Sequence, residues 1–462
     1  MPNLAMRDAP TIDSELNDVY YRGMQLASLA IVARAYVAAR WRMARLRSPN
    51  AVRRYQQRQL ARLIRDAARD LPFYRAYTGV PFDAWPVLDK AAQLADFAAL
   101  NQAGLTADAV RAALIRGEER IGGHLIGMST GTSGNRGVYV ITEAERFVWL
   151  GTILAKTLPD ALWRRHRVAL ALPAVGDLYR SATVGSRIAL RFFDSGAGPD
   201  TWVDALGDHD PDTIVASPKI LRWLAERGRL HATRIFSGAE VLDPLDRVVI
   251  EGATGRRVRQ IYMATEGLFG VACAHGTLHL AEDVVHFDYE RPDPAGPLVT
   301  PIVTDFTRRA QAMIRYHMND LLELDPTRCP CGSAFQAVKR VEGRADDAFL
   351  LADASGEVRM VTPDLIRNAV VDADPAILDF RVVQTGVAAI TVSLDSALPA
   401  LAAERARLAL ERALGGRGLR AAITLERGIE PDFTRKLRRV RRDWRPDLPA
   451  GAAADWARAD GR

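Results

Sequence analysis

The sequence has few cysteines, few lysines and no long apolar run. Its 462 residues include three cysteines, which cannot form a disulfide framework and therefore indicate a reducing compartment. The most apolar stretch, Leu26–Val37, is interrupted by Arg34, whereas a membrane span needs about 20 predominantly apolar residues. The first 22 residues are polar and mixed in charge, so we expect no signal peptide. These absences predict a cytoplasmic protein without a transmembrane segment.

The scarcity of lysine leaves arginine to carry most of the positive charge. Only five of the 62 basic residues are lysine, and the formal net charge is +6 with a pI of about 9.3. This excess is small for so long a chain, so we do not expect nucleic acid as a partner. Hydrophobic residues make up 48% and charged residues 26%, which excludes a disordered or collagen-like chain. The length predicts two or three domains.

Residues 20–78 have the periodicity of helices. Apolar residues recur at helical spacing between Leu60 and Leu71, and Pro72 ends the pattern. The segment Met24–Leu46 carries several arginines among apolar residues, so it could form a basic amphipathic helix on an anionic membrane. A helix packed on the main domain, with its arginines in water, is the favoured alternative.

Beyond about residue 120, short apolar runs alternate with helical patterns. Such alternation predicts an α/β fold with a largely parallel sheet. One of the helices is predicted at Pro218–Arg227. The predicted strands are Arg167–Pro173, Ile188–Phe193, Thr213–Ala216, Arg234–Phe236, Val258–Tyr262 and Leu298–Thr304.

A domain boundary is predicted near Gly343–Asp347. Two predicted strands downstream, 380–384 and 388–394, flank a hairpin turn at Thr385-Gly386. A helix at Ala397–Leu414 and a further strand follow, which together predict a small α+β domain. We therefore predict a helical N-terminal region over 1–100, an α/β core with mostly parallel sheets over 101–343, and the small domain over 344–462.

One segment is rich in glycine and hydroxyl groups. Its three glycines would let backbone amides approach a polyphosphate, and four hydroxyls within five residues could donate to phosphate oxygens. It is not a Walker loop, because Arg136-Gly137 stand where that motif requires glycine and lysine. A flexible linker is the alternative interpretation. The segment reads Ser129-Thr130-Gly131-Thr132-Ser133-Gly134-Asn135-Arg136-Gly137.

Two carboxylates follow predicted strands or conspicuous motifs. Glu266, at the end of a predicted strand, could bind magnesium, because hard cations prefer carboxylate oxygens. Asp320 follows Arg315-Tyr316 and could accept hydrogen bonds from both hydroxyls of a ribose. Taken singly, each is also consistent with an ordinary loop carboxylate.

All three cysteines belong to one further pattern. Cys273 precedes His275 and His279, and Cys329 and Cys331 are separated by one residue. Three thiolates and one imidazole are the ligand set of a closed structural zinc site. We favour His279 over His275 as the fourth ligand. Thiols without a metal are the alternative.

Taken in order, these motifs resemble those of the acyl-adenylate-forming ligases, most closely the phenylacetate–coenzyme A ligase branch. That family carries a hydroxyl-rich glycine loop, Tyr-Gly-Ala-Thr-Glu, Arg-Tyr-Arg-Thr-Gly-Asp, Gly-Arg-x-Asp-Asp and a lysine near the C-terminus. The resemblance covers roughly residues 55–445. The counterparts here are Ser129–Gly137, Tyr262–Glu266, Arg315–Asp320, Gly343–Asp347 and Lys436.

The resemblance implies a large domain, a small mobile C-terminal domain, and ATP-dependent activation of a carboxylic acid. Catalytic roles would belong to Lys436, Glu266 and Thr265, with Glu266 on magnesium and Asp346 as the hinge. The implied nucleotide-binding residues are Ser129, Thr130, Gly131, Thr132, Ser133, Gly134 and Arg136 at the β- and γ-phosphates, Gly238, Ala239, Glu240 and Tyr262 at the adenine, and Asp320 and Arg344 at the ribose.

The chain departs from the family pattern at several positions. Met263 replaces a glycine, Met318-Asn319 replace threonine and glycine, and residues 348–357 differ from the usual turn near the coenzyme A site. These changes leave the adenylation residues in place. The acceptor stays open between a thiol such as coenzyme A and an amine or other small nucleophile. An aromatic acid substrate, a homodimer and a non-catalytic nucleotide-binding protein are further open alternatives.

Overall fold

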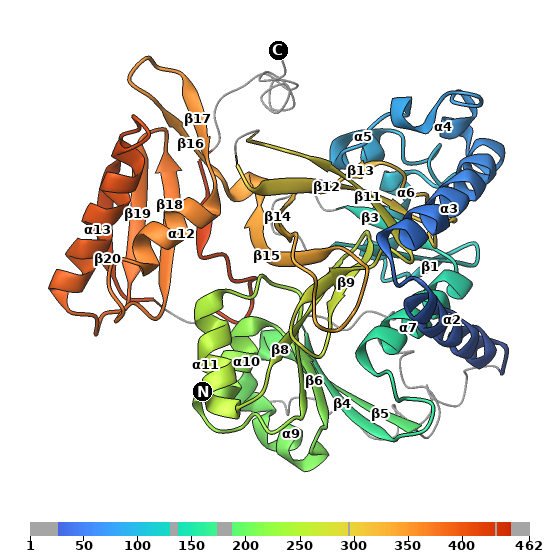
Figure 1. The fold of residues 1–462 in the computed structure, drawn as a ribbon, viewed down its shortest axis with the longest axis horizontal. Helices are drawn as coiled ribbons and strands as arrows, with labels where there is room; N and C mark the ends of the chain where they lie inside the picture. The colour runs from blue at the N-terminus through green and yellow to red at the C-terminus, as the bar shows by residue number, and fades with distance from the viewer. Residues whose placement is uncertain (1–25, 130–136, 173–186, 294–295, 430–431, 445–462) are drawn as a thin grey trace, which may run out of the picture.

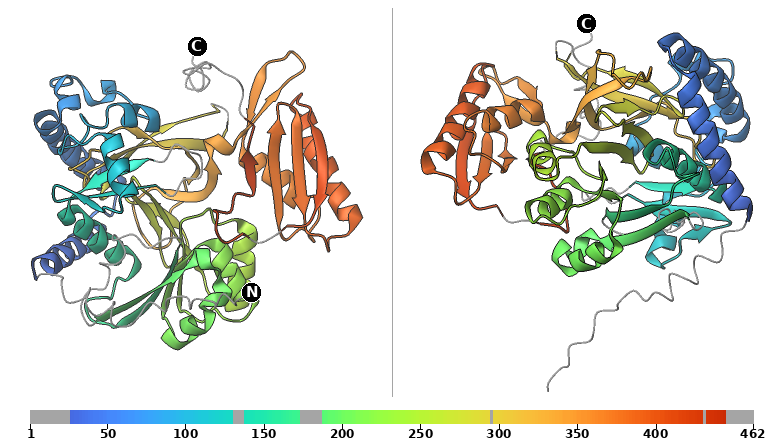
Figure 2. Two further views of the ribbon diagram at one scale, coloured as in Figure 1. Left: turned by 180° about the vertical axis from the view of Figure 1, so that it is seen from behind. Right: turned by 60° about the horizontal axis from the view of Figure 1, so that its bottom comes forward.

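The chain folds into a large body and a smaller one beside it (Figure 1). The computed structural model describes residues 26–129, 137–172, 187–293, 296–429 and 432–444. Figure 2 shows from two further sides that the smaller body, formed by the residues after about 348, stands beside the large one. Within the described ranges, no helix is both long enough and apolar enough to cross a membrane.

A mixed sheet of twelve strands runs through the large body. Its parallel part consists of β4 (His166–Leu172), β5 (Ile188–Asp194), β6 (Thr213–Ala216), β7 (Arg234–Ser237) and β8 (Val258–Ala264). Antiparallel strands continue it: β9 (Gly267–Ala272), β10 (Leu278–Leu280), β11 (Val285–Glu290), β12 (Leu298–Asp305), β13 (Tyr316–His317), β14 (Asp320–Asp325) and β15 (Ala337–Arg344). The order is β11-β12-β14-β15-β10-β9-β8-β7-β6-β4-β5, and β13 pairs with β12.

The α/β class and the parallel pairing of β4 to β8 are confirmed. The sheet as a whole is mixed rather than mostly parallel, and the predicted strand Leu298–Thr304 lies in its antiparallel part as β12. Short turns, such as Thr265-Glu266 between β8 and β9, join antiparallel neighbours. Helices connect β5 to β6, β6 to β7 and β7 to β8, because a parallel neighbour requires a crossover back to the starting edge. Their apolar faces build one core with the inner faces of the strands, which includes Ile214, Leu221, Ile235 and Ile250. These helices are α9 (Val203–His209), α10 (Pro218–Glu226) and α11 (Pro244–Thr254).

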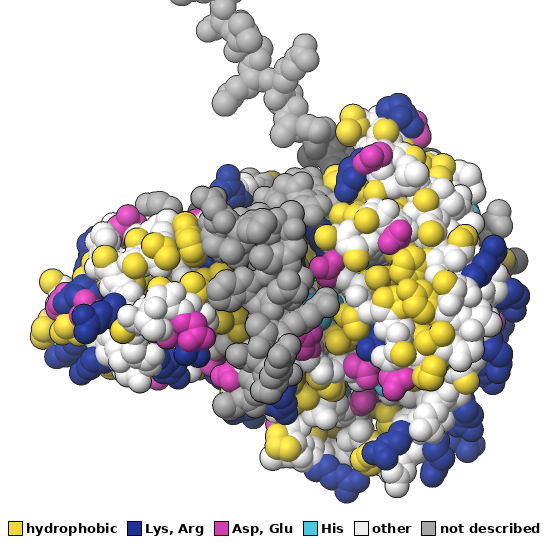
Figure 3. Space-filling model, turned by 90° about the horizontal axis from the view of Figure 1, so that it is seen from above, with side chains coloured by type: hydrophobic (Ala, Val, Ile, Leu, Met, Phe, Trp, Pro, Cys, Tyr) yellow, Lys and Arg dark blue, Asp and Glu magenta, His cyan; other side chains and the backbone are white. Residues whose placement is uncertain are grey.

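Two long helices form the N-terminal side of the large body: α2 (Leu26–Arg45) and α3 (Pro49–Asp70). α2 packs on α7 (Glu143–Thr157) so closely that a Cβ at Gly151 would lie 2.4 Å from the carbonyl oxygen of Val32. The packed-helix interpretation of this segment therefore matches the structure. Residues 26–65 include ten arginines and no acidic residue. Figure 3 shows Lys and Arg side chains along this edge of the molecule.

A three-stranded sheet lies against the shorter helices of the large body. It consists of β1 (Arg120–Ile121), β2 (His124–Met128) and β3 (Val138–Ile141), and β2 and β3 pair antiparallel. The hydroxyl-rich segment therefore joins the two strands of a hairpin. The accompanying helices are α4 (Pro72–Arg75), α5 (Lys90–Ala95) and α6 (Ala107–Ile115).

The smaller body has a hydrophobic core of its own, which includes Phe349, Phe380 and Leu410. The predicted hairpin is present, since β18 (Phe380–Gly386) and β19 (Ala389–Leu394) pair antiparallel. The predicted turn Thr385-Gly386 instead ends β18, and the connection is Val387-Ala388. Its main sheet has the order β20-β19-β18-β21. The elements are β16 (Phe349–Ala352), β17 (Val358–Val361), α12 (Pro363–Val371), β18 (Phe380–Gly386), β19 (Ala389–Leu394), α13 (Ala400–Gly415), β20 (Ala422–Arg427) and β21 (Val440–Arg442).

Ion pairs join the two bodies. Asp246 on α11 accepts two hydrogen bonds from Arg439, at 2.6 and 2.8 Å, and all the atoms involved are buried. Arg367 on α12 donates to both carboxylate oxygens of Asp243, at 2.9 and 3.0 Å. Both arginines belong to the smaller body, so these contacts fix its orientation on α11.

Candidate functional site

Polar residues gather where three of the parallel strands end. Ser217 follows β6, Ser237 ends β7, and Thr265-Glu266 form the turn between β8 and β9. The hydroxyls of Ser217 and Ser237 are buried without a hydrogen-bond partner in the described part of the chain. Ligands of open α/β sheets bind beyond the carboxyl ends of the strands, so unpartnered hydroxyls there suit a polar ligand.

Two of the motifs hold their backbone in a strained conformation. Ala239 has φ +65° and Arg315 has φ +47°, values that residues other than glycine rarely adopt. Ala239 follows Gly238, whose amide donates to the carbonyl of Ala216 at 3.0 Å. Such strain persists where the surrounding structure enforces it, and it is concentrated at functional sites.

Asp320 and Tyr262 come together from opposite parts of the sheet. The Tyr262 hydroxyl donates to the Asp320 carboxylate at 2.8 Å. Burial raises the pKa of Asp320, while Tyr262 and the Arg344 guanidinium act in the opposite direction. Arg344 ends β15 and is the direct strand partner of Asp320. The predicted ribose-binding residues therefore lie side by side.

Glu266 projects from the β8–β9 turn toward Tyr316, whose hydroxyl donates to it at 3.3 Å. Lys90, the first residue of α5, lies close enough for Glu266 to act on its pKa. Partial burial lowers that pKa, and Glu266 opposes the shift. Lys90 is a cation of the site to which the sequence analysis assigned no role. Its place at the start of a helix did not indicate a role, because only the fold brings α5 to Glu266.

Lys436 comes to the site from the smaller body. Lys436 is exposed along part of its side chain, while protein atoms around its ammonium group lower its pKa by desolvation. Arg344 also lowers this pKa, whereas Glu240, Asp320 and Glu266 favour the charged form. All three carboxylates belong to the large body. The structure thus brings the predicted lysine to the predicted acidic residues across the boundary between the two bodies.

The hydroxyl-rich loop can be followed at its two ends. The Ser129 amide donates to the Gly137 carbonyl at 2.8 Å, and the Gly137 amide donates to the Ser129 hydroxyl at 3.0 Å. A Cβ at Gly137 would lie 3.3 Å from the Lys90 side chain, so the loop begins beside that cation. The other predicted loop residues lie outside the described ranges: Thr130, Gly131, Thr132, Ser133, Gly134 and Arg136.

The predicted hinge residue is tied to the large body. The side-chain amide of Asn319 donates to the Asp346 carboxylate, and the Ala345 amide donates to the Asn319 carbonyl at 2.9 Å. Asn319 is one of the positions at which the chain departs from the family pattern. The substituted residue therefore contacts the segment that links the two bodies.

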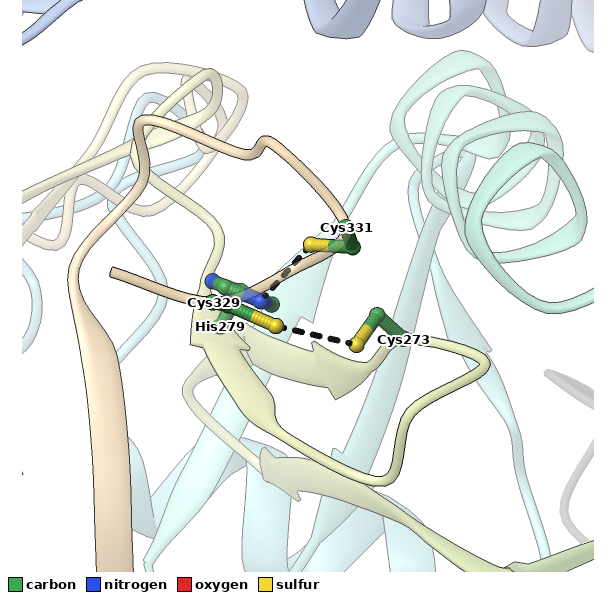
Figure 4. A group of neighbouring side chains, drawn as sticks. All are labelled: Cys273, His279, Cys329 and Cys331. Atoms are coloured by element: carbon green, nitrogen blue, oxygen red, sulfur yellow. Dashed lines mark hydrogen bonds between the residues drawn. The ribbon is translucent and has the colours of Figure 1, made fainter. Parts of the chain in front are cut away.

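The cysteines and one histidine converge beside one end of the antiparallel strands β9 and β10 (Figure 4). The Cys273 and Cys329 sulfurs are 3.7 Å apart, and the Cys331 sulfur lies 3.3 Å from the His279 Nε2. One candidate ligand atom from each of these four residues lies within 4.8 Å of all the others. The Phe335 carbonyl lies 3.2 Å from His279 Nδ1 and can orient the ring with Nε2 toward the sulfurs. The predicted choice of His279 matches this arrangement.

Known proteins resemble the chain in sequence and in fold. A phenylacetate-coenzyme A ligase of Thermus thermophilus is 24% identical over 176 residues, which are 34% of this chain and 39% of that protein. The match thus spans about two fifths of that relative's length. No protein-family model matches.

The solved structures that resemble the chain include two states of 2-hydroxyisobutyryl-CoA ligase. The postadenylation state in complex with 2-HIB-AMP has a TM-score of 0.62 and 22% identity, covering 85% of this chain and 89% of that one. An open conformation in complex with 2-HIB-AMP and CoA has a TM-score of 0.55 and 20% identity, covering 85% and 90%. The amide bond synthetase McbA from Marinactinospora thermotolerans has a TM-score of 0.52 and 12% identity, covering 68% of each chain.

The resemblance predicted from the motifs is thereby confirmed. The chain has the fold of 2-hydroxyisobutyryl-CoA ligase, and part of its sequence is similar to a phenylacetate-coenzyme A ligase.

Proposed function

We propose that this protein activates a carboxylic acid with ATP, through an acyl-adenylate and with release of pyrophosphate. The observation that supports this most strongly is the position of Lys436. It comes from a separate body and lies close enough to Glu240, Asp320 and Glu266 for their charges to act on its pKa.

In this proposal the nucleotide lies along the motifs of the large body. Asp320, with Arg344, accepts the ribose hydroxyls, and Tyr262, Gly238, Ala239 and Glu240 line the adenine. The buried Oε2 atom of Glu240 has no hydrogen-bond partner among the described residues, so it suits a donor on the base. The hydroxyl-rich loop and Lys90 face the β- and γ-phosphates. Glu266 offers a hard oxygen ligand for a magnesium ion, which would neutralise phosphate charge when bound.

The adenylation step forms one bond and breaks another at the α-phosphorus. An oxygen of the substrate carboxylate attacks that phosphorus, and the bond to the bridging oxygen of pyrophosphate breaks, so pyrophosphate leaves. Lys436 and Thr265 lie at the α-phosphate and stabilise the negative charge that develops there. The protein contributes positioning and electrostatic stabilisation, which suffice for a displacement between bound reactants.

The second step passes the acyl group to a nucleophile. We propose a thiol, in particular coenzyme A, because the sequence match is to a coenzyme A ligase. The alternative is an amine, which is supported by the fold similarity to an amide bond synthetase and by the divergent residues 348–357. We further propose that residues 344–462 form the mobile domain that alternates between the two steps. The three free cysteines favour a cytoplasmic enzyme.

The direct test is pyrophosphate release from ATP with a panel of aromatic and aliphatic acids, with and without coenzyme A. We expect release that depends on one class of acid, and an acyl-thioester when coenzyme A is present. Release followed by transfer only to amines would select the alternative acceptor. Nucleotide binding without release for any acid would instead indicate a non-catalytic protein.

We also propose that Cys273, His279, Cys329 and Cys331 bind one structural zinc ion. Three sulfurs and one ring nitrogen converge from separate turns and β10, and these are the ligands that zinc prefers. The cluster ties the turn after β9 to the connection between β14 and β15. Its role would therefore be to stabilise the antiparallel part of the sheet.

A further inference from the structure

The peptide groups on both sides of Lys436 contact one ion pair of the large body. Lys219, near the start of α10, donates through Nζ to the carbonyl of Asp432 at 3.1 Å and to the carbonyl of Arg435. The same Nζ lies 3.2 Å from Glu240 Oε1. The side chains of Lys219 and Glu240 are only 12% and 3% exposed. Lys219 thus holds the residue that precedes Lys436.

Glu240 acts on the other side of Lys436. Burial raises the pKa of Glu240, and Lys219, the amide of Leu437 and Lys436 act in the opposite direction. The amide of the residue after Lys436 is therefore directed at the carboxylate that Lys219 contacts. A third constraint comes from Arg439, which is fixed by Asp246.

We propose that Lys219 and Glu240 form a clamp that positions the Lys436 ammonium for adenylation. This inference rests on the proposed function. It assigns to Lys219 a positioning role that its neighbours in sequence do not suggest. Lys219 is a positioning residue, since its contacts are to the main chain beside Lys436. A stabilising charge must be held in place, because a displacement of about 1 Å can reduce a rate by about a hundredfold.

The clamp predicts that substitutions at Lys219 and Lys436 are not additive. Lys219→Met keeps the aliphatic stem and removes the charge, and we expect the rate of ATP–pyrophosphate exchange to fall about tenfold to a hundredfold. Lys436→Ala should lower it about 10²–10³-fold, the usual effect of removing one charge-stabilising donor. In the Lys436→Ala background, Lys219→Met should cost less than about twofold, because nothing is left to position.

Lys339→Ala is the matched control. Lys339 is an exposed lysine that also forms an ion pair, at 2.6 Å with Glu323, and its loss should leave the exchange rate unchanged. If Lys219→Met does not fold, Glu240→Gln tests the clamp instead, because Glu240 is its second residue. Equal losses from Lys219→Met in both backgrounds, or no loss in either, would overturn the clamp. No exchange by the unsubstituted protein with any acid would instead contradict the proposed function itself.

Discussion

At the scale of single residues, the surroundings of Lys436 partly disfavour the protonated form of its side chain. Its pKa lies below the ordinary lysine value of 10.5, because protein atoms displace its water. Catalysis by electrostatic stabilisation requires the protonated form, so activity should be lost as the pH rises through the lowered pKa. The pH at which activity falls on the alkaline side therefore depends on how much the three neighbouring carboxylates offset the desolvation of Lys436.

We expect kcat/KM for adenylation to fall at a pH below 10.5, since this quantity reports the pKa values of the free enzyme. Lys436→Arg should remove this fall in kcat/KM at alkaline pH, because a guanidinium stays protonated in proteins. The measurement is the initial rate of pyrophosphate release at low ATP concentration across alkaline pH. The same fall in rate at alkaline pH in the arginine variant would show that a group other than Lys436 causes it.

Asp320 is the residue through which we expect ATP affinity to be set. Asp320→Ala should raise the KM for ATP about tenfold or more, because hydrogen bonds to a charged group contribute about 1.5–3 kcal/mol. Glu323→Gln, three residues further along β14, is the control and should leave the KM unchanged. Circular dichroism would confirm that both variants fold. An unaltered KM in Asp320→Ala would exclude the ribose assignment.

Residues that act through their own chemistry were predictable from the sequence, whereas those that act through placement were not. Asp320, Tyr262 and Glu266 stand in motifs, and the structure brings them together. Lys219 and Lys90 lie at the site only because α10 and α5 begin beside it. A local sequence pattern does not indicate which distant elements the fold brings together at the site.

At the scale of elements, the parallel strands were predictable and most antiparallel strands were not. β6 occupies the predicted range, because an apolar run between turn residues indicates a strand buried on both faces. β10 has three residues, and β13 has two. Segments of this length are too short to show any period, so pairing with neighbours alone makes them strands.

The Cys/His cluster is the element-scale feature most open to test. Protein purified without added metal should contain about one zinc ion per chain, as measured by elemental analysis. Cys329→Ser and His279→Ala should each lose the metal and lower the melting temperature, because a structural zinc site contributes folding free energy. His275→Ala, at an exposed position near the cluster, is the control and should keep the metal. Metal-free protein of normal stability would refute the zinc proposal.

At the scale of the whole molecule, the sequence predicted a second compact unit after about residue 344, and the structure places a separate core there. What the sequence could not indicate is how the two bodies meet. Asp243, Asp246, Arg367 and Arg439 lie far apart in the chain, and each is an ordinary charged residue until the fold pairs them.

The contact between Asn319 and Asp346 should bias the orientation of the small body. Asn319→Ala removes one hydrogen bond worth about 1 kcal/mol, so the balance between the two orientations should shift about fivefold. We expect a slower adenylation rate relative to acyl transfer from a supplied acyl-adenylate. Asn319→Asp places a like charge beside Asp346 and should shift this ratio further in the same direction. An unchanged ratio in both variants would exclude Asn319 as a restraint on the hinge.

The ion pairs between the two bodies also determine what happens when they separate. Carboxylates and guanidinium groups that leave one another regain water, and their hydration offsets most of the attraction that is lost. A boundary of apolar side chains would instead expose a sticky surface at every turnover. If the smaller body alternates between orientations as proposed, it separates along charged groups and need not pass through a form that tends to aggregate.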